Sequence, residues 1–477
     1  MAVEISAVLL SGEALPMRLS PDSLVKHVKL AAQQHFRRGS LSLVSASGEI
    51  LDPTEALRDL RGDVRVVTCI PQTVTVSSQR RGFYAISSSG LVVPWGDVGP
   101  VPKDLTNVRC IQQATSACAA IKHDGTVVTW GDPEEGGDSS EVQEQLRDVV
   151  QVQASSGAFA AIRANGTVVT WGLGWMGGDS SDVQEELAHV ATIQASAHGF
   201  AAIRADGQVV TWGGCDDGLH DREVQRKLRK VVEIQATGLS FAALCADGAV
   251  ATWGLSDMEG DSRQVQEQLQ DVRKIQATCG AFAALRGDGT VVTWGDPNIG
   301  GDSSQVQDRL VQVQQIQSNS SAFAALRDDG TVVTWGSPRS GGNSSQVQEH
   351  LRQVAHLQAT DRAFAATCFD GRVVTWGASE CGGDSLQVQD QLHDVQHIQS
   401  TSSAFAALLA DGRVITWGHS DRGGDSSRVQ DQLAHVQQIQ SNAGAFVALR
   451  DDSRLVTWGC PRSGGDSSDV QEQLQLL

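Results

Sequence analysis

The sequence predicts a mainly-β protein in which most of the chain forms a β-propeller of about ten units of 41 residues. Tryptophan followed by glycine recurs nine times at intervals of 41 residues, from Trp130 to Trp458. A fixed period of this size is typical of stacked repeat units. A tenth Trp-Gly pair, at Trp95, lies 35 residues before Trp130. We therefore expect two domains, residues 1–72, which do not repeat, and residues 73–477, which form the propeller.

The unit that begins at Ile316 illustrates the strands. Ile316–Ser318 is short and bounded by polar residues, and Ala322–Arg327 follows as a second strand. Asp329-Gly330 predicts a two-residue type I′ hairpin turn, which needs positive φ at both central positions. Thr331–Trp335 is rich in β-branched residues and ends the unit as a third strand.

The connector after each Trp-Gly pair changes its pattern. Val347, Leu351 and Val354 lie at i, i+4 and i+7, a spacing that predicts a short helix with one apolar face. Ser345 and Gln348 fit a capping box at its start. Each unit is therefore predicted to contain three strands and a short helix.

Apolar side chains lie on both faces of the second strand, with Phe323 and Ala325 on one and Ala324 and Leu326 on the other. Sheets covered on both faces are what propeller blades need. The repeated tryptophan is expected to fill the gap between blades. An open α/β solenoid of the same units is the alternative.

The two ends of the repeat region suggest how a ring closes. The first unit begins with an extra strand, residues 73–76, and the last unit stops after its helix, residues 467–477. We expect the extra strand to complete the last blade. The repeat pattern leaves the number of blades in one ring open.

Composition excludes several classes of function. The chain has 477 residues, with 37 basic and 56 acidic side chains and a net charge of −19. Such a surface repels phosphate backbones, so nucleic acid is not an expected partner. No apolar run approaches the roughly 20 residues that cross a bilayer, and no secretory leader is recognisable. Nine scattered cysteines suit a reducing compartment, so the cytoplasm is expected, with the nucleus as the alternative.

The motifs predict a protein without catalytic residues, metal or cofactor. Aspartates such as Asp138 and Asp302 recur in register before seven of the short helices, where carboxylates cap the N-terminus. Calcium would need several converging oxygens per site. Histidines and cysteines lack zinc-ligand spacing, and no phosphate-binding glycine motif or nucleophile–base pair is present. We therefore expect a non-enzyme.

Loops that break the repeat are the candidate binding residues. They belong to three consecutive units, and we predict that these form one protein-binding edge, with drift in a tolerant repeat as the alternative. Exposed apolar residues often mark partner surfaces. The candidates are Trp175, Met176, Asp216, Asp217, Leu219, His220, Asp257 and Met258, with Arg226 and Lys227 from a basic cluster.

The motif Ala-Phe-Ala-Ala-Leu-x-x-Asp-Gly-x-Val-Val-Thr-Trp-Gly, residues 322–336, resembles the regulator-of-chromosome-condensation repeat family. The resemblance implies a β-propeller, commonly with seven blades. The short period is closer to the bacterial β-lactamase-inhibitor propellers, and similar repeats occur in HECT-type ubiquitin ligases. Two features depart from the family: Gly-Gly-Asp-Ser-Ser replaces its Gly-Gln-Leu-Gly segment, and ten copies exceed its usual number.

Residues 1–72 resemble a ubiquitin-like β-grasp domain. Val3–Leu9 and Leu15–Leu19 are predicted strands, a helix is expected from Ser20 to about Phe36, and strands follow at Leu41–Val44 and Val64–Val67. No Gly-Gly pair follows Ile70, so conjugation through this segment is not expected.

Taken together, these features predict a non-catalytic protein–protein interaction scaffold, with a role as a ubiquitin-pathway adaptor implied by the resemblances. Its partner is expected to be a protein that the sequence does not name, rather than nucleic acid or membrane. Two alternatives stay open: guanine-nucleotide exchange on a small GTPase, and inhibition of an enzyme by a propeller face.

Overall fold

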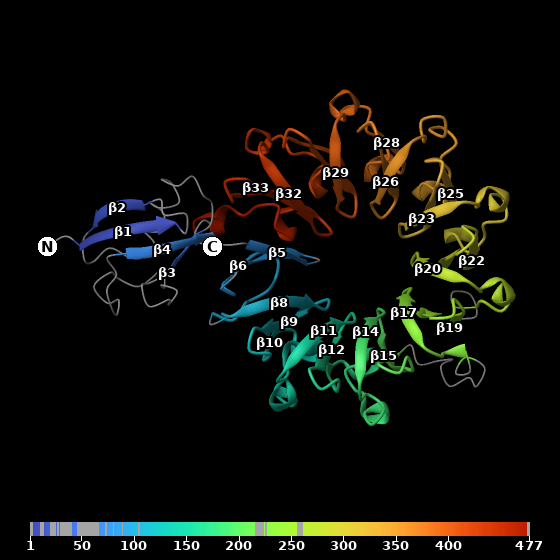
Figure 1. Ribbon diagram of the computed structural model, residues 1–477, viewed down its shortest axis with the longest axis horizontal. Coiled ribbons are helices and arrows are strands. Elements are labelled where there is room, and N and C mark those ends of the chain that lie inside the picture. The colour runs from blue at the N-terminus through green and yellow to red at the C-terminus, as the bar shows by residue number, and fades with distance from the viewer. Residues whose placement is uncertain are drawn as a thin grey trace.

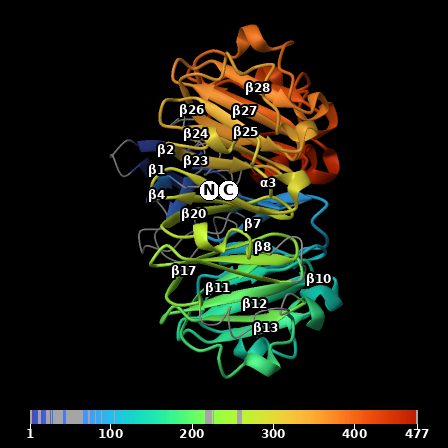
Figure 2. The same ribbon diagram turned by 90° about the vertical axis from the view of Figure 1, so that its right-hand side faces the viewer.

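The protein is described from a computed structural model, which shows ten three-stranded antiparallel sheets arranged in sequence order around a ring (Figure 1). Figure 2 shows the same sheets side by side from the edge of the ring. The structure describes residues 3–9, 14–19, 25, 28, 41–44, 66–71, 74–79, 81–87, 89–103, 105–214, 224, 227–254 and 261–474.

We number the sheets as blades 1 to 10. Blades 1 to 5 contain β5 (Val74–Gln79), β6 (Gly82–Ser87) and β7 (Val92–Gly96); β8 (Val108–Gln113), β9 (Ala117–Lys122) and β10 (Val127–Gly131); β11 (Val149–Ala154), β12 (Ala158–Arg163) and β13 (Val168–Gly172); β14 (Val190–Ala195), β15 (Gly199–Arg204) and β16 (Val209–Gly213); β17 (Val231–Ala236), β18 (Ser240–Cys245) and β19 (Val250–Gly254). Blades 6 to 10 contain β20 (Val272–Ala277), β21 (Ala281–Arg286) and β22 (Val291–Gly295); β23 (Val313–Ser318), β24 (Ala322–Arg327) and β25 (Val332–Gly336); β26 (Val354–Ala359), β27 (Ala363–Cys368) and β28 (Val373–Gly377); β29 (Val395–Ser400), β30 (Ala404–Leu409) and β31 (Val414–Gly418); β32 (Val436–Ser441), β33 (Ala445–Arg450) and β34 (Leu455–Gly459).

The first strand of each blade lies toward the ring axis and the third toward the outside (Figure 1). The middle strand is therefore covered at both edges by its own blade and on both faces by neighbouring blades. Phe323 in β24 is fully buried, and the alanines beside it are buried as well. The predicted burial of both faces is confirmed.

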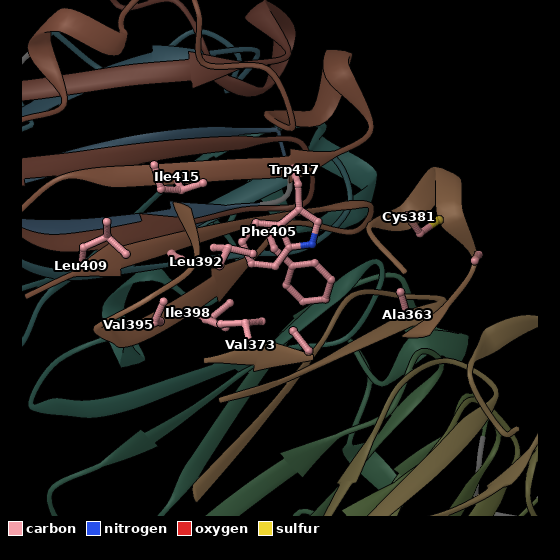
Figure 3. Packing of buried hydrophobic residues seen from close by; sticks show 13 residues of the cluster. Ala363, Val373, Cys381, Leu392, Val395, Ile398, Phe405, Leu409, Ile415 and Trp417 are labelled. Atoms are coloured by element: carbon pink, nitrogen blue, oxygen red, sulfur yellow. The ribbon is translucent and has the colours of Figure 1, made fainter. Parts of the chain in front are cut away.

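The repeated tryptophan connects each blade to the one before it, as the sequence predicted. Trp335 is 3% exposed and stacks on Phe323 of its own blade, with ring centroids 5.1 Å apart. Its indole Nε1 donates to the carbonyl oxygen of Gly300 in the preceding connector (3.0 Å). The same cluster contains Ala281 and Ala283 of blade 6. Figure 3 shows the equivalent cluster between blades 8 and 9, where Trp417 and Phe405 lie at the centre.

The hairpin turns differ from the predicted two-residue type. The Gly330 N–H donates to the Arg327 carbonyl (3.0 Å), and the Arg327 N–H donates to the Thr331 carbonyl (2.9 Å), so the loop has three residues. Only Gly330 takes positive φ, at 74°, because Asp329 uses its carboxylate to accept the Thr331 N–H (2.9 Å). This is a type I turn followed by a left-handed glycine.

The predicted short helices are wrong for most of the connectors that the structure describes, although Val224 and Lys227 in the connector after blade 4 are α-helical. The connectors instead contain turns and 3₁₀ segments of three residues, such as η8 (Gln307–Arg309) and η11 (Gln389–Gln391); the one α-helix described near the end of the chain, α3 (Gln471–Leu474), has four residues. The apolar spacing is still explained, because Leu351 and Val354 are buried against the blades.

The predicted capping box is replaced by a network that holds the connector to the outer strand. The Ser344 hydroxyl, rather than that of Ser345, donates to Gln348 Oε1 (3.0 Å), and Gln348 Nε2 donates to the Val332 carbonyl (2.9 Å). Thr334 donates to Ser344 in turn (3.0 Å). The glutamine amide thereby donates to a backbone carbonyl of the edge strand that would otherwise have no hydrogen-bond partner in the sheet.

The ring closes between blades 10 and 1, so the open solenoid does not describe this chain. Trp95 Nε1 donates to the Gly464 carbonyl (3.0 Å), and the Asp97 N–H donates to the Arg462 carbonyl (2.7 Å). The sequence predicted that the extra strand completes the last blade, and this prediction is wrong, because β5 pairs with β6 in blade 1. Closure comes from these hydrogen bonds and from packing, in which Leu474 joins the cluster around Phe83.

The part of residues 1–72 that the structure describes contains a four-stranded sheet. It comprises β1 (Val3–Leu9), β2 (Ala14–Leu19), β3 (Leu41–Val44) and β4 (Val66–Pro71), in the order β2-β1-β4-β3. β1 and β4 pair in parallel, and the outer pairs are antiparallel. Most of the predicted helix from Ser20 to Phe36 lies outside the described residues. Among the described helices, none has the length and apolar character to span a membrane.

Candidate protein-binding surface

The turns between first and second strands form one end of the ring, which we call the turn face. Neighbouring turns are joined by backbone hydrogen bonds. The Thr115 N–H donates to the Ser156 carbonyl (2.8 Å), and the Ser156 N–H donates to the Ala197 carbonyl (3.0 Å). The same bond runs from Gly238 to Cys279, Cys279 to Ser320, Ser320 to Asp361, Asp361 to Ser402 and Ser402 to Ala443. Side chains on this face therefore have a rigid support.

Among the residues of this face that the structure describes, Trp175 is an exposed aromatic residue. It lies in the 3₁₀ segment η4 (Gly174–Met176), and 59% of its surface is exposed. Its ring stacks on His198 in the turn of the next blade, with centroids 5.7 Å apart and planes inclined by 27°. Gly177 fixes the end of this segment, because it has a φ of 97° and a Cβ there would lie 2.5 Å from a Phe200 ring carbon.

Met176 has a different environment from Trp175. It is half-buried and packs on the cluster that contains Phe200 and Trp212. Its carbonyl accepts a hydrogen bond from the Ser155 hydroxyl (2.9 Å). Replacing Met176 would therefore disturb the packing between blades, which makes Trp175 the cleaner residue for a binding test.

The remaining candidates are only partly described. Lys227 is half-buried, and its carbonyl accepts a hydrogen bond from the Cys245 thiol (3.3 Å). The other candidates lie outside the described residues: Asp216, Asp217, Leu219, His220, Arg226, Asp257 and Met258. The structure therefore describes only Trp175, Met176 and Lys227 among the candidates, and the three-unit edge stays a prediction.

His198 was missed by sequence reasoning. It directly precedes β15, the strand that contains Phe200, and the corresponding residues of blades 3 and 6 are Gly157 and Gly280. Serine, leucine and arginine occupy this position in other blades, so the variation of side chains there did not single out His198. Its role as the stacking partner of Trp175 depends on a contact between two units, which the pattern of one unit does not show.

The aspartates that recur in the connectors have structural partners. Asp179 Oδ1 accepts the Ser181 N–H (2.9 Å), and this hydrogen bond lowers the pKa of the Asp179 carboxyl. Asp302 accepts the Ser304 N–H in the same way (2.8 Å). In the part of the chain that the structure describes, no three His, Cys, Asp or Glu side chains converge as metal ligands.

A buried thiol and phenol form the most unusual polar pair. Tyr84 Oη and Cys118 Sγ lie 3.4 Å apart between blades 1 and 2. Burial raises the pKa of the Cys118 thiol to about 11 and raises the pKa of the Tyr84 phenol even further above its ordinary value. Both groups therefore stay protonated at neutral pH, which suits packing rather than nucleophilic chemistry.

No protein-family model matches the sequence, and no curated protein sequence matches it either. Solved structures show similarity of fold. The designed protein Ika8 is 16% identical, with a TM-score of 0.32, and the match covers 65% of this chain and 96% of Ika8. Prp20p from Saccharomyces cerevisiae is 16% identical, with a TM-score of 0.34, over 64% of this chain and 83% of Prp20p. Human WBSCR16 is 16% identical, with a TM-score of 0.29, over 57% of this chain and 78% of that protein.

The chain is similar in fold to RCC1-like β-propellers. The published description of Prp20p concerns its binding to Gsp1p and histones, which is a property of that protein. The likeness of this chain extends to the repeated sheets around a ring, and the propeller assignment itself rests on the ten sheets and the closure contacts described above.

Proposed function

We propose that this protein is a non-catalytic scaffold that binds another protein through the turn face of its propeller. The exposed ring of Trp175, held in place by His198, carries this proposal. Tryptophan is enriched among residues that dominate binding energy, and a preorganised ring loses little entropy on binding. The backbone bonds that join neighbouring turns keep the surrounding surface rigid.

The finer role that we propose is that of an adaptor in the ubiquitin pathway, with residues 1–72 as a ubiquitin-like domain. The order β2-β1-β4-β3 and the parallel pairing of β1 with β4 at its centre support this role. A β-grasp sheet places its first and last strands in this way. Full-length protein on beads should then retain proteins of the ubiquitin pathway, whereas retention of nucleotide-free GTPases would favour the exchange alternative.

Replacing Trp175 tests the proposed surface. We expect Trp175→Ser to reduce the recovery of partners by roughly tenfold or more, since a central aromatic residue often contributes about 2 kcal/mol or more to binding. The melting temperature should change little, because the side chain is largely exposed. Quantitative mass spectrometry of proteins crosslinked to wild type and variant measures both partner identity and amount.

The control is Phe369→Ser, which removes a 79% exposed aromatic residue from the hairpin between β27 and β28. That hairpin lies at the end of the ring opposite the turn face, so the control should keep the partners of the wild type. Equal recovery by the wild type and Trp175→Ser would show that the turn face does not bind the partner.

A further inference from the structure

A groove of about 910 Å³ lies on the outside of the ring between the connectors of blades 8 and 9. Its floor is the outer strand β31, where Ile415 and Thr416 are mostly buried. Its walls come from the two connectors, with Gln387 and Gln391 on one side and Gln430 on the other. The groove is distinct from the turn-face surface around Trp175.

Carboxylates give this groove a negative lining. Glu380, Asp384 and Asp425 line it, and the lining contains neither lysine nor arginine. Asp384 accepts the backbone N–H of Leu386 (2.9 Å), and Asp425 accepts that of Ser427 (2.9 Å), so both carboxylates have fixed orientations.

Two arginines lie near these carboxylates. Arg362 pairs with Glu380 (3.2 Å). Arg428, next along the chain from Ser427, lies close enough to Asp425 to help lower the pKa of its carboxyl, which the Ser427 N–H lowers most. Asp384 therefore remains as a carboxylate held only by a backbone N–H among the contacts described, and the groove keeps an excess of negative charge.

Leu386 supplies an apolar group at the rim of the groove. It lies between Ser385 and Gln387, which both line the groove, and 80% of its surface is exposed. The corresponding residues of the neighbouring connectors are Ser345 and Ser427, whose N–H groups make the same bond to the preceding Asn or Asp. The leucine side chain is therefore not needed for the local structure.

We propose that this groove binds an extended basic segment of a partner protein. A lysine or arginine side chain of that segment would face Asp384, which has no arginine beside it among the contacts described, and an adjacent apolar residue would pack on Leu386. Charge complementarity favours this occupant, because opposite charges at a water-excluding contact increase both the rate of encounter and the specificity. The inference shares with the proposed function only the premise that the chain binds proteins.

Short random peptides displayed on phage, selected on the full-length protein, test the proposal. Enriched peptides should carry a lysine or arginine next to an apolar residue, and synthetic copies should bind more weakly as salt rises. The variant Asp384→Asn/Leu386→Ser should bind these copies roughly tenfold more weakly. Both changes copy the residues of blade 7, Asn343 and Ser345, which make the same turn, so the variant should fold.

The matched control is Ser345→Leu, which places a leucine on the neighbouring connector and should leave peptide affinity unchanged. Selected peptides without a basic bias, or equal affinities for the wild type and the double variant, would overturn the proposal. Trp175→Ser should not affect peptide binding, so the outcome for this groove is independent of the outcome for the turn face.

Discussion

At the scale of single residues, the interface between blades 1 and 2 differs from the others in which blade contributes the large side chain and which the small one. In most interfaces a small alanine faces a phenylalanine of the next blade, as Ala283 faces Phe323. Between blades 1 and 2 the large and small residues are reversed, because Tyr84 of β6 faces Cys118 of β9. Tyr84 also meets Trp130 edge to face, with centroids 6.0 Å apart. The tyrosine thus fills space that a phenylalanine fills elsewhere.

This exchange predicts a non-additive pair of substitutions. Tyr84→Ala should lower the free energy of unfolding by about 3–5 kcal/mol, because it leaves a cavity between two blades. Cys118→Phe alone should cost about 1–3 kcal/mol through overpacking against Tyr84. The double variant restores the arrangement of Ala283 and Phe323 and should recover most of the loss.

Denaturant unfolding followed by tryptophan fluorescence measures all three variants. A double variant no more stable than Tyr84→Ala would contradict the packing described here. The raised pKa of Cys118 adds a second readout, since the folded protein should protect this thiol from alkylation at mildly alkaline pH far better than the exposed thiol of Cys279.

At the scale of elements, most of the described connectors protect the outer edge of their own blade. The chain of hydrogen bonds from Thr334 through Ser344 to Gln348 ends on the carbonyl of Val332. The residues that repeat most evenly in the connector therefore have a structural role. Sequence spacing alone suggested a helix, because a turn followed by a 3₁₀ segment also presents apolar residues to one side.

The aspartates at the start of the connectors predict acid sensitivity. Hydrogen bonds from backbone N–H groups lower the pKa values of Asp138, Asp179, Asp302 and Asp425 in the folded protein. A folded-state pKa below the unfolded value stabilises the fold above the unfolded pKa, near 3.8. That contribution is lost as pH falls through the lower, folded-state pKa.

Changing these four aspartates to asparagine should reduce the loss of melting temperature between about pH 6 and pH 3. Asn343 shows that an amide supports the same turn, because its Oδ1 accepts the Ser345 N–H (3.0 Å). Differential scanning calorimetry at both pH values provides the comparison. An unchanged pH dependence would mean that other carboxylates dominate acid unfolding.

At the scale of the whole molecule, ring closure uses the same contact as every internal interface for which the bond is described. Trp95 binds the Gly464 carbonyl as Trp335 binds that of Gly300. Asn442 adds a hydrogen bond from its amide to the Gly82 carbonyl (3.1 Å). Blade 10 therefore contacts blade 1 in the way that an internal blade contacts the next one.

If the ring is closed, removing the tryptophan between blades 10 and 1 should destabilise the fold as much as removing a tryptophan between two internal blades. Trp95→Ala and Trp335→Ala should each lower stability by about 3–5 kcal/mol, because both remove a buried indole that spans two blades. Thermal unfolding of the two variants, compared with small-angle scattering of the wild type, tests this expectation. A much smaller effect of Trp95→Ala would indicate that blades 10 and 1 are separate in solution.

The sequence by itself determined the repeat length, the β-rich units, the burial of both faces of the middle strand and the place of the tryptophan between blades. These features follow from side-chain patterns within one unit, which the fixed period repeats. It also indicated Trp175 as an exception to the pattern, but gave no sign of its contact with His198.

The tertiary structure alone decided that ten blades close one ring, that β5 remains in blade 1, and that Leu386 lies at the rim of an acidic groove. The angle between neighbouring blades sets the number of blades, and it arises from many small contacts between residues about 41 positions apart. The geometry of such contacts cannot be predicted from the side-chain pattern of a single unit. For the same physical reason, the surfaces that we propose for binding became visible only when neighbouring units were placed side by side.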